Sequence, residues 1–183
     1  MNLPPGFYGI ADADHGDPFE QFRLLAEEGV GAVQLRCKGW STTARVALAR
    51  RCGAGGPLLV LNDDVAAALE AGTWVHVGQE DGPDPDVPFG RSTHDLEQVR
   101  AARSTYVGFG PVFASGTKPH GPALGIERLA DAVQASRAPI VAIGGITSDN
   151  VDAVRDTGVH GWTAIGAVWR SPDPRSVIRR LRG

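Results

Sequence analysis

The sequence predicts an α/β fold, and three observations point to a short (βα)8 TIM barrel built from residues 1-183 as a single domain. Apolar, strand-like runs alternate with helix-like stretches, which implies crossover connections and a parallel sheet. About eight such runs can be counted, the number that a closed barrel needs. Most of the runs are continuously apolar, as expected for strands buried on both faces. An open doubly wound sheet is the alternative.

Each expected element has its own signal in the sequence. Asp17 and Pro18 form a typical helix start, Gly29 ends that helix, and Ser41 caps the next one. The chain is short for such a barrel, and the proline-rich segment 81–88 cannot hold a helix, so the fourth helix is expected to be missing. The strands are expected at 7–11, 31–36, 57–61, 74–77, 89–92, 106–109, 140–143 and 162–165. Later helices are expected at 65–69, 95–102, 126–135, 150–155 and 174–181.

Composition excludes several classes of function. The net charge of −3 provides no basic field for nucleic acid. Cys37 and Cys52 indicate neither a disulfide framework nor a zinc site, and Cys37 has no partner motif that would make it a nucleophile. No signal peptide and no apolar run of about 18 residues is found, so we expect no membrane partner and a cytoplasmic location. The four tryptophans would suit a core or an interface, so a homo-oligomer stays open.

Two glycine-rich segments follow the sixth and seventh expected strands, and both have the character of anion-binding loops. Glycines let backbone N–H groups approach a ligand closely, while hydroxyls and an ammonium group add donors and charge. The first segment contains Gly108, Gly110, Ser115, Gly116, Thr117 and Lys118. The second ends in Gly144 and Gly145 and is followed by Thr147 at an expected helix start. Together the two segments predict one or two phosphorylated substrates.

Polar residues also gather where other strands end, which is where the active site of such a barrel lies. Alternation along a strand places Gln34, Arg36 and Lys38 on one face. Taken alone, Asp63 would more simply be a helix cap and His94 a packing residue. Convergence favours function, because cations, carboxylates and glycine loops would meet at one mouth. The further polar strand ends are Asn62-Asp63-Asp64, His76 to Asp81, and Ser92-Thr93-His94. This pattern fits a diphosphate bound by cations and by a Mg²⁺ ion that carboxylates hold.

Six segments in register resemble the thiamine phosphate synthase family. They are Gln34 to Lys38, Leu61-Asn62-Asp63, Val75 to Asp81, Ser92-Thr93-His94, Gly108 to Lys118, and Ala142 to Ile146. The TenI-like thiazole tautomerases resemble the chain as well and share the fold. The resemblance implies coupling of hydroxymethylpyrimidine diphosphate to thiazole phosphate, with release of diphosphate in thiamine biosynthesis. It thus implies a Mg²⁺-dependent transferase acting on small phosphorylated substrates.

The resemblance also implies roles for individual residues. Arg36, Lys38, Asn62 and Lys118 would hold the diphosphate, and Asp63 and Asp81 would bind Mg²⁺. Gln34 and Ser92 would lie near the pyrimidine. Thiazole-phosphate and loop positions would be Ser115, Thr117, Gly145, Ile165 and Gly166. Ser115 replaces a usual threonine, Gly166 replaces a common serine, and the segment before the first strand is short.

Two other functions stay open at this point. In the tautomerases the histidine that matches His94 is the acid/base group, so His94 would be catalytic in a thiazole tautomerase, an isomerase without metal. A non-catalytic, phosphate-sensing regulator on the same barrel is the third possibility. The intact Asn62, Asp63 and Asp81 favour the synthase, because a tautomerase has no diphosphate to bind.

Overall fold

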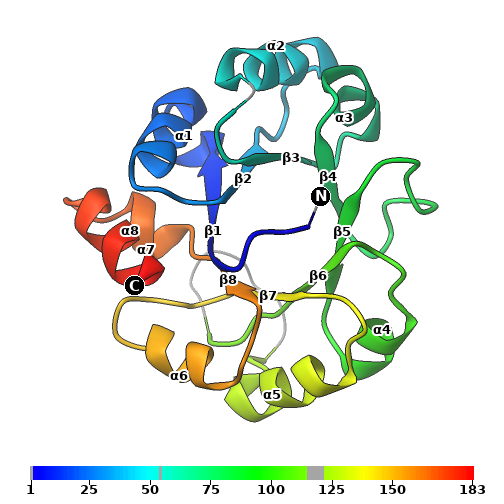
Figure 1. Ribbon diagram of the computed structural model, residues 1–183, viewed down its shortest axis with the longest axis vertical. Coiled ribbons are helices and arrows are strands. Elements are labelled where there is room, and N and C mark those ends of the chain that lie inside the picture. Colours follow the sequence, from blue (N-terminus) through cyan, green and yellow to red (C-terminus); the bar gives the residue numbers. More distant parts are fainter. Residues whose placement is uncertain (1, 54, 115–121) are drawn as a thin grey trace.

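The computed structural model describes residues 2–53, 55–114 and 122–183 and contains a closed barrel of eight parallel strands in sequence order. Figure 1 looks down the barrel, with the strands as an inner ring and the helices around them. The predicted (βα)8 fold is therefore confirmed. The strands are β1 (Gly6–Asp12), β2 (Ala32–Arg36), β3 (Leu58–Asn62), β4 (Trp74–Val77), β5 (Phe89–Thr93), β6 (Tyr106–Phe109), β7 (Ile140–Ala142) and β8 (Gly161–Trp162).

The helices follow the expected order, with small differences. Residues 78–88, between β4 and β5, form no helix, as the prolines predict. The eighth strand is two residues long rather than four, because the chain leaves the sheet after Trp162 and enters the short helix α7 at Gly166. The helices are η1 (Ala13–His15), α1 (Pro18–Glu27), α2 (Thr42–Cys52), α3 (Val65–Ala71), α4 (Leu96–Ala101), α5 (Gly125–Ala135), α6 (Val151–Asp156), α7 (Gly166–Trp169) and α8 (Pro174–Arg182). The described helices include none that is long and apolar enough to span a bilayer.

The predicted caps explain where the first helices begin. The Asp17 carboxylate accepts a hydrogen bond of 2.8 Å from the backbone N–H of Phe19, and Pro18 occupies the first position of α1. Ser41 accepts a hydrogen bond of 3.2 Å from Ala44 at the start of α2. These bonds satisfy N–H groups that a helix start leaves without a partner.

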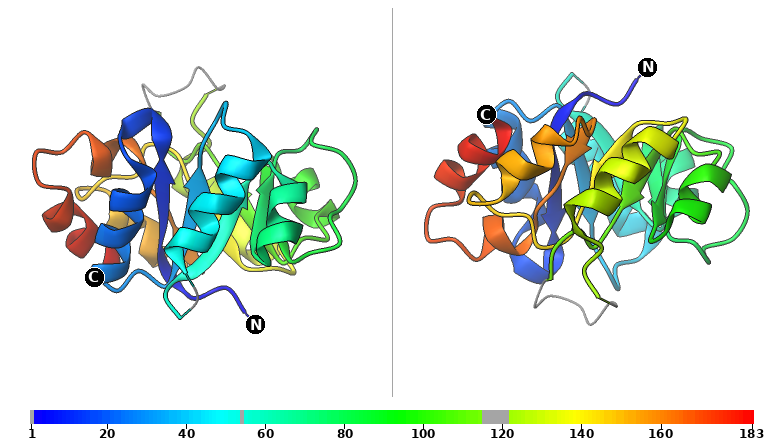
Figure 2. Two further views of the ribbon diagram at one scale, coloured as in Figure 1. Left: turned by 90° about the horizontal axis from the view of Figure 1, so that it is seen from above. Right: turned by 90° about the horizontal axis from the view of Figure 1, so that it is seen from below.

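Two separate cores hold the barrel together. The larger one lies between the strands and the surrounding helices and includes Leu25, Leu61 and Leu129. The smaller one includes Tyr8, Trp74 and Tyr106, which alternation points into the barrel. Leu3, from the short N-terminal segment, belongs to this inner cluster and is 3% exposed. That segment crosses the ring in Figure 1 and lies at the end of the barrel from which β1 departs in Figure 2.

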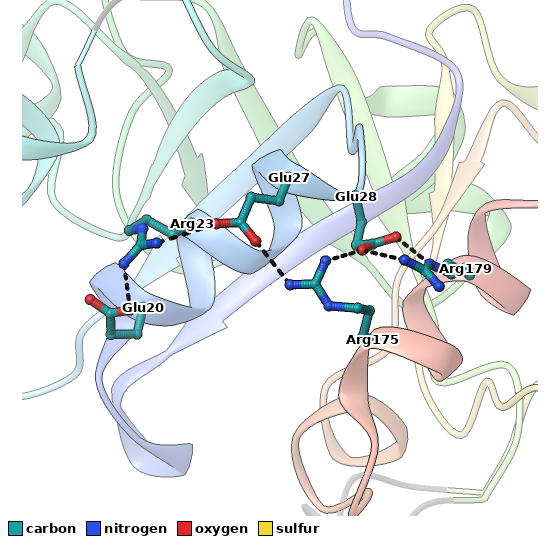
Figure 3. A network of polar contacts seen from close by, with 6 residues as sticks. All are labelled: Glu20, Arg23, Glu27, Glu28, Arg175 and Arg179. Carbon is teal, nitrogen blue, oxygen red and sulfur yellow. Dashed lines mark hydrogen bonds and ion pairs between the residues drawn. The ribbon is translucent and has the colours of Figure 1, made fainter.

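The last helix closes the ring of helices against the first one. Figure 3 shows Arg175 and Arg179 of α8 meeting Glu27 and Glu28 at the end of α1. Arg179 Nε donates to Glu28 at 2.7 Å, and Arg175 donates to Glu27 at 2.9 Å and also to Glu28. We call Glu20, Arg23, Glu27, Glu28, Arg175 and Arg179 the α1–α8 cluster. Its ion pairs reinforce the closure that the hydrogen bonds between β1 and β8 begin.

Candidate active site

A cavity of about 880 Å³ lies at the carboxyl ends of the strands. This is the end at which barrel enzymes place their active sites. The cavity is large enough for a small-molecule site. Nine of the predicted site residues line it: Gln34, Arg36, Lys38, Asn62, Ser92, His94, Gly145, Ile165 and Gly166. The structure thus brings together residues that lie more than one hundred positions apart in the sequence.

Arg36 provides a buried positive charge on the β1–β2 side of the mouth. Its Nη1 donates to both oxygens of Asp12, at 2.9 and 2.8 Å, and to Asp14 at 3.1 Å. Asp12 is 2% exposed and Arg36 9%, whereas the Asp14 side chain is 59% exposed. Lys38 lines the same side and is exposed. The exposed Asp14 can leave Arg36 easily, so a ligand anion can take its place while Asp12 continues to hold the guanidinium.

The two predicted metal ligands lie on the β3–β4 side, where the charge of Asp81 acts on Asp63, although neither lines the cavity itself. Desolvation and then the Asp81 carboxylate raise the pKa of Asp63 above its usual value. Asp63 also has a φ of +62°, a left-handed conformation that aspartate adopts more readily than most residues other than glycine. The Asp81 carboxylate accepts a hydrogen bond from the N–H of Gly78.

These carboxylates fit a Mg²⁺ ion that is shared with substrate. Mg²⁺ is usually bound through one or two carboxylates together with phosphate oxygens and water. Desolvation is the main cause of the raised pKa of Asp63 and the Asp81 charge the second, and a divalent cation would oppose both. Within residues 2–53, 55–114 and 122–183, no cluster of three or more His, Cys, Asp or Glu could hold a metal ion.

The β6–β8 side of the mouth presents glycine backbone, together with Arg170 at the end of α7. Gly145 has a φ of +64°, and a Cβ there would lie 2.7 Å from both the Ala114 carbonyl and the Phe113 side chain. At Gly144 the φ is +100°, and a Cβ would lie 2.6 Å from Pro111. Only glycine fits this turn, which packs directly on the loop after β6. Ser115, Thr117 and Lys118 lie outside the described residues, so their predicted roles stay predictions.

The cavity floor is polar although it lies inside the barrel. Gln34 donates to the Tyr8 hydroxyl at 3.3 Å, and the hydroxyls of Tyr8 and Tyr106 are 3.0 Å apart. His76 Nδ1 lies 2.9 Å from the Tyr106 hydroxyl, and His76 Nε2 lies 2.9 Å from Ser92 Oγ. Burial lowers the pKa of His76 to about 4 and raises those of both tyrosines. The imidazole and the phenols are therefore neutral at physiological pH.

Known proteins can now be compared with this geometry. Residues 7–168 match the family model described as thiamine monophosphate synthase. The chain belongs to the thiamine monophosphate synthase family. It is 31% identical to a thiamine-phosphate synthase of Caldivirga maquilingensis, over 99% of this chain and 97% of that protein. A thiamine phosphate pyrophosphorylase from Pyrococcus furiosus superposes with a TM-score of 0.84 at 31% identity, over 97% of this chain and 93% of that one.

Some relatives in the thiamine monophosphate synthase family are longer than this chain. A thiamine-phosphate synthase of Synechococcus sp. (strain CC9605) is 39% identical over 90% of the chain, but the chain spans only 51% of that protein. The chain thus spans about half the length of this relative. The matching part corresponds to the barrel described above.

His94 lies at the rim with a defined tautomer. Its Nδ1 is 2.7 Å from the Gly110 carbonyl oxygen, which can only accept, so Nδ1 carries the proton. In the neutral imidazole, Nε2 is then the acceptor. The backbone N–H of His94 donates to Gln98 at 2.7 Å. The residue combines a structural role at the start of α4 with a place on the cavity wall.

Sequence reasoning missed several residues that line the cavity of this family member. Tyr8, Tyr106 and Thr163 come from strands that read as apolar, and Asp12 and Arg170 carry no motif. The alternation rule would have found the tyrosines, since both occupy inward positions of their strands. The two cysteines are free, and burial raises the pKa of Cys37 to about 11, so this thiol is not activated.

Proposed function

We propose that the protein is a thiamine phosphate synthase, a transferase that couples hydroxymethylpyrimidine diphosphate to thiazole phosphate and releases diphosphate. The observation that carries the proposal is the cavity, which joins a cationic side, a polar floor and a glycine side at one mouth. Each part suits one part of the two substrates. The reducing conditions of the cytoplasm would suit the two free cysteines.

The cationic side would bind and stabilise the leaving diphosphate. Arg36 and Lys38 neutralise charge that grows on the diphosphate oxygens as the carbon–oxygen bond breaks. Asn62 lines the cavity at the end of β3 and supplies an amide for the same anion. Asp63 and Asp81 would hold Mg²⁺, which would add Lewis-acid stabilisation of the same charge.

The remaining walls would position the two reacting rings. Gln34 and Ser92 hold the pyrimidine over the floor, where the electron-rich ring stabilises the cation that forms when diphosphate departs. The glycine turn at Gly145, with Ile165 and Gly166, holds the thiazole phosphate so that the thiazole nitrogen faces the new cation. Attack by that nitrogen forms the carbon–nitrogen bond. The step depends on orientation more than on proton transfer.

A second candidate, thiazole tautomerase, is favoured by one observation. His94 lines the cavity, and its neutral imidazole would present Nε2 as an acceptor, as a general base requires. The carboxylates Asp63 and Asp81 have no task in that reaction. We therefore place the synthase first.

One assay with one variant separates the candidates. Purified protein is incubated with both phosphorylated substrates and Mg²⁺, and thiamine phosphate and the thiazole tautomer are both measured. We expect thiamine phosphate from the wild type, and most of this activity in His94→Asn. Loss of a general acid or base typically costs roughly 10²–10⁴-fold. Tautomerisation alone, with such a loss in His94→Asn, would establish the isomerase instead.

A further inference from the structure

Five polar side chains form one continuous hydrogen-bond chain through the barrel interior. The order is Gln34, Tyr8, Tyr106, His76 and Ser92, with successive separations of 3.3, 3.0, 2.9 and 2.9 Å. Tyr8 is 4% exposed and Tyr106 1%. Buried groups of this kind are costly when a donor or acceptor stays unsatisfied, so every proton in the chain needs a partner.

The Gln34 end fixes the direction of the chain. Its amide nitrogen can only donate, so the Tyr8 oxygen accepts there and must place its own proton elsewhere. The next oxygen along the chain is that of Tyr106, which accepts from Tyr8. In the reverse direction both Gln34 and Tyr106 would donate to Tyr8, and the buried Tyr8 proton would have no acceptor in the chain. Only one direction satisfies every member from within the chain, whereas the other leaves the Tyr8 proton to the cavity that Tyr8 lines.

The same logic continues to the end of the chain. Tyr106 accepts from Tyr8, so its own proton goes to His76 Nδ1. The proton of the neutral imidazole is then on Nε2, which donates to Ser92 Oγ. Ser92 accepts there and keeps its own hydroxyl proton for the cavity that it lines. At the other end, the Gln34 amide oxygen remains an acceptor.

The neighbouring strands make room for this chain. A Cβ on Gly90 of β5 would lie 2.1 Å from Tyr106 Cζ, so the phenol occupies the space that a side chain would need. A Cβ on Gly108 of β6 would lie 3.0 Å from His76 Cε1. Trp74 stacks on the Tyr106 ring at 6.5 Å between centroids. Packing therefore locks the two rings that carry the chain.

From this arrangement we infer that Tyr8, Tyr106 and His76 are positioning residues, which hold Ser92 as a hydrogen-bond donor and Gln34 as an acceptor toward the substrate. The inference rests on the proposed function for the identity of that substrate. An aminopyrimidine offers the complementary pair, a ring nitrogen that accepts and an amino group that donates. The chain would thus favour this heterocycle by orienting the Ser92 and Gln34 groups that bind it.

The tautomer of His76 is the first test, and it needs no activity. Protein labelled with ¹⁵N-histidine is measured by NMR, and the His76 signals are assigned by their loss in His76→Asn. We expect the Nε2–H tautomer in the wild type and a mixture of tautomers in Tyr106→Phe, which removes the donor to Nδ1. An Nδ1–H tautomer in the wild type would mean that the chain runs the other way and would overturn the inference.

Kinetics provide the second test. Tyr106→Phe keeps the ring but removes the hydroxyl that links Tyr8 to His76, so the hydrogen bonds of Gln34 and Ser92 no longer have a fixed direction. KM for the pyrimidine substrate should then rise about tenfold, a difference of about 1.4 kcal/mol, while KM for thiazole phosphate stays unchanged. Trp74→Phe disturbs the same packing without altering the chain, and should lower Tm but leave both KM values. If both variants changed KM equally, the hydrogen-bond chain would have only a structural role, and the inference would be wrong. If the wild type makes no thiamine phosphate, the proposed function is refuted. The NMR measurement of the His76 tautomer would still test the direction of the hydrogen-bond chain.

Discussion

Two carboxylates in this molecule, Asp63 at the mouth and Glu28 in the α1–α8 cluster, have pKa values that move in opposite directions. Hydrogen bonds from Arg179 and Arg175 lower the pKa of Glu28, despite desolvation. Desolvation and the neighbouring Asp81 raise the pKa of Asp63. The charge of Glu28 is thus favoured by folding and that of Asp63 is opposed by it. Desolvation opposes both charges, but the two arginines outweigh it at Glu28, whereas the charge of Asp81 adds to it at Asp63.

Replacing Asp63 should give the largest effect and should separate function from stability. In Asp63→Asn we expect turnover to fall roughly 10²-fold, the scale of one preorganised electrostatic group. The pKa of Asp63 is raised in the folded state, so ionised Asp63 costs stability above the unfolded pKa of about 3.9. The variant should therefore melt at a higher temperature than the wild type at pH 7 but not at pH 3. Asparagine also accepts the positive φ.

Assays at saturating Mg²⁺ and thermal melts at both pH values check this prediction. Asp64→Asn is a matched control, because Asp64 caps α3 and bonds to Arg45 at 2.7 Å rather than facing Asp81. The pKa of Asp64 is lowered, so that variant should be less stable at pH 7. A loss of stability in Asp63→Asn at pH 7 would contradict the proposed contrast.

Arg36 is the exception at the mouth, because its pair with Asp12 is buried and the same guanidinium is proposed to bind diphosphate. Arg36→Met would leave the carboxylate of Asp12 buried without its cation, which typically costs about 3 kcal/mol of unfolding free energy. Adding Asp12→Asn should recover most of that stability but no coupling activity. Denaturant unfolding and turnover are measured for both variants. Recovery of activity in the double variant would show that Arg36 does not bind diphosphate.

The fold could be predicted almost completely from the sequence, because its signals are local. Apolar runs, the caps at Asp17 and Ser41 and the prolines of 81–88 each act within a few residues. The predicted end of β8 was wrong, because the chain enters at Gly166 a helix of four residues, which is too short to show a periodic pattern. Short helices carry too few positions for an apolar face to be recognised.

The candidate site could be predicted only in part. Residues that follow strands were found, because parallel strands bring their carboxyl ends together. Tyr8 and Tyr106 were missed, since a tyrosine inside an apolar strand reads as core until its hydroxyl partner is known. That partner lies 98 residues away for this pair. The ion pair between Arg36 and Asp12 was missed for a similar reason, because it depends on the register of β1 against β2.

Glu28 should give the smallest effect and the opposite pH dependence. Its pKa is lowered by Arg179 and Arg175, so its charge contributes stability above the unfolded pKa of about 4.3, and that contribution disappears as the pH falls through the lowered folded value. Glu28→Gln should therefore reduce Tm at pH 7 and leave Tm unchanged near pH 2. It should leave coupling activity intact at every pH at which the variant stays folded. Arg23→Ala removes exposed pairs with Glu20 and Glu27 in the same cluster (Figure 3) and should shift Tm by less than about 2 °C. If Glu28→Gln instead raised Tm at pH 7, the α1–α8 cluster would resemble the mouth, and the contrast between scaffold and site would fail.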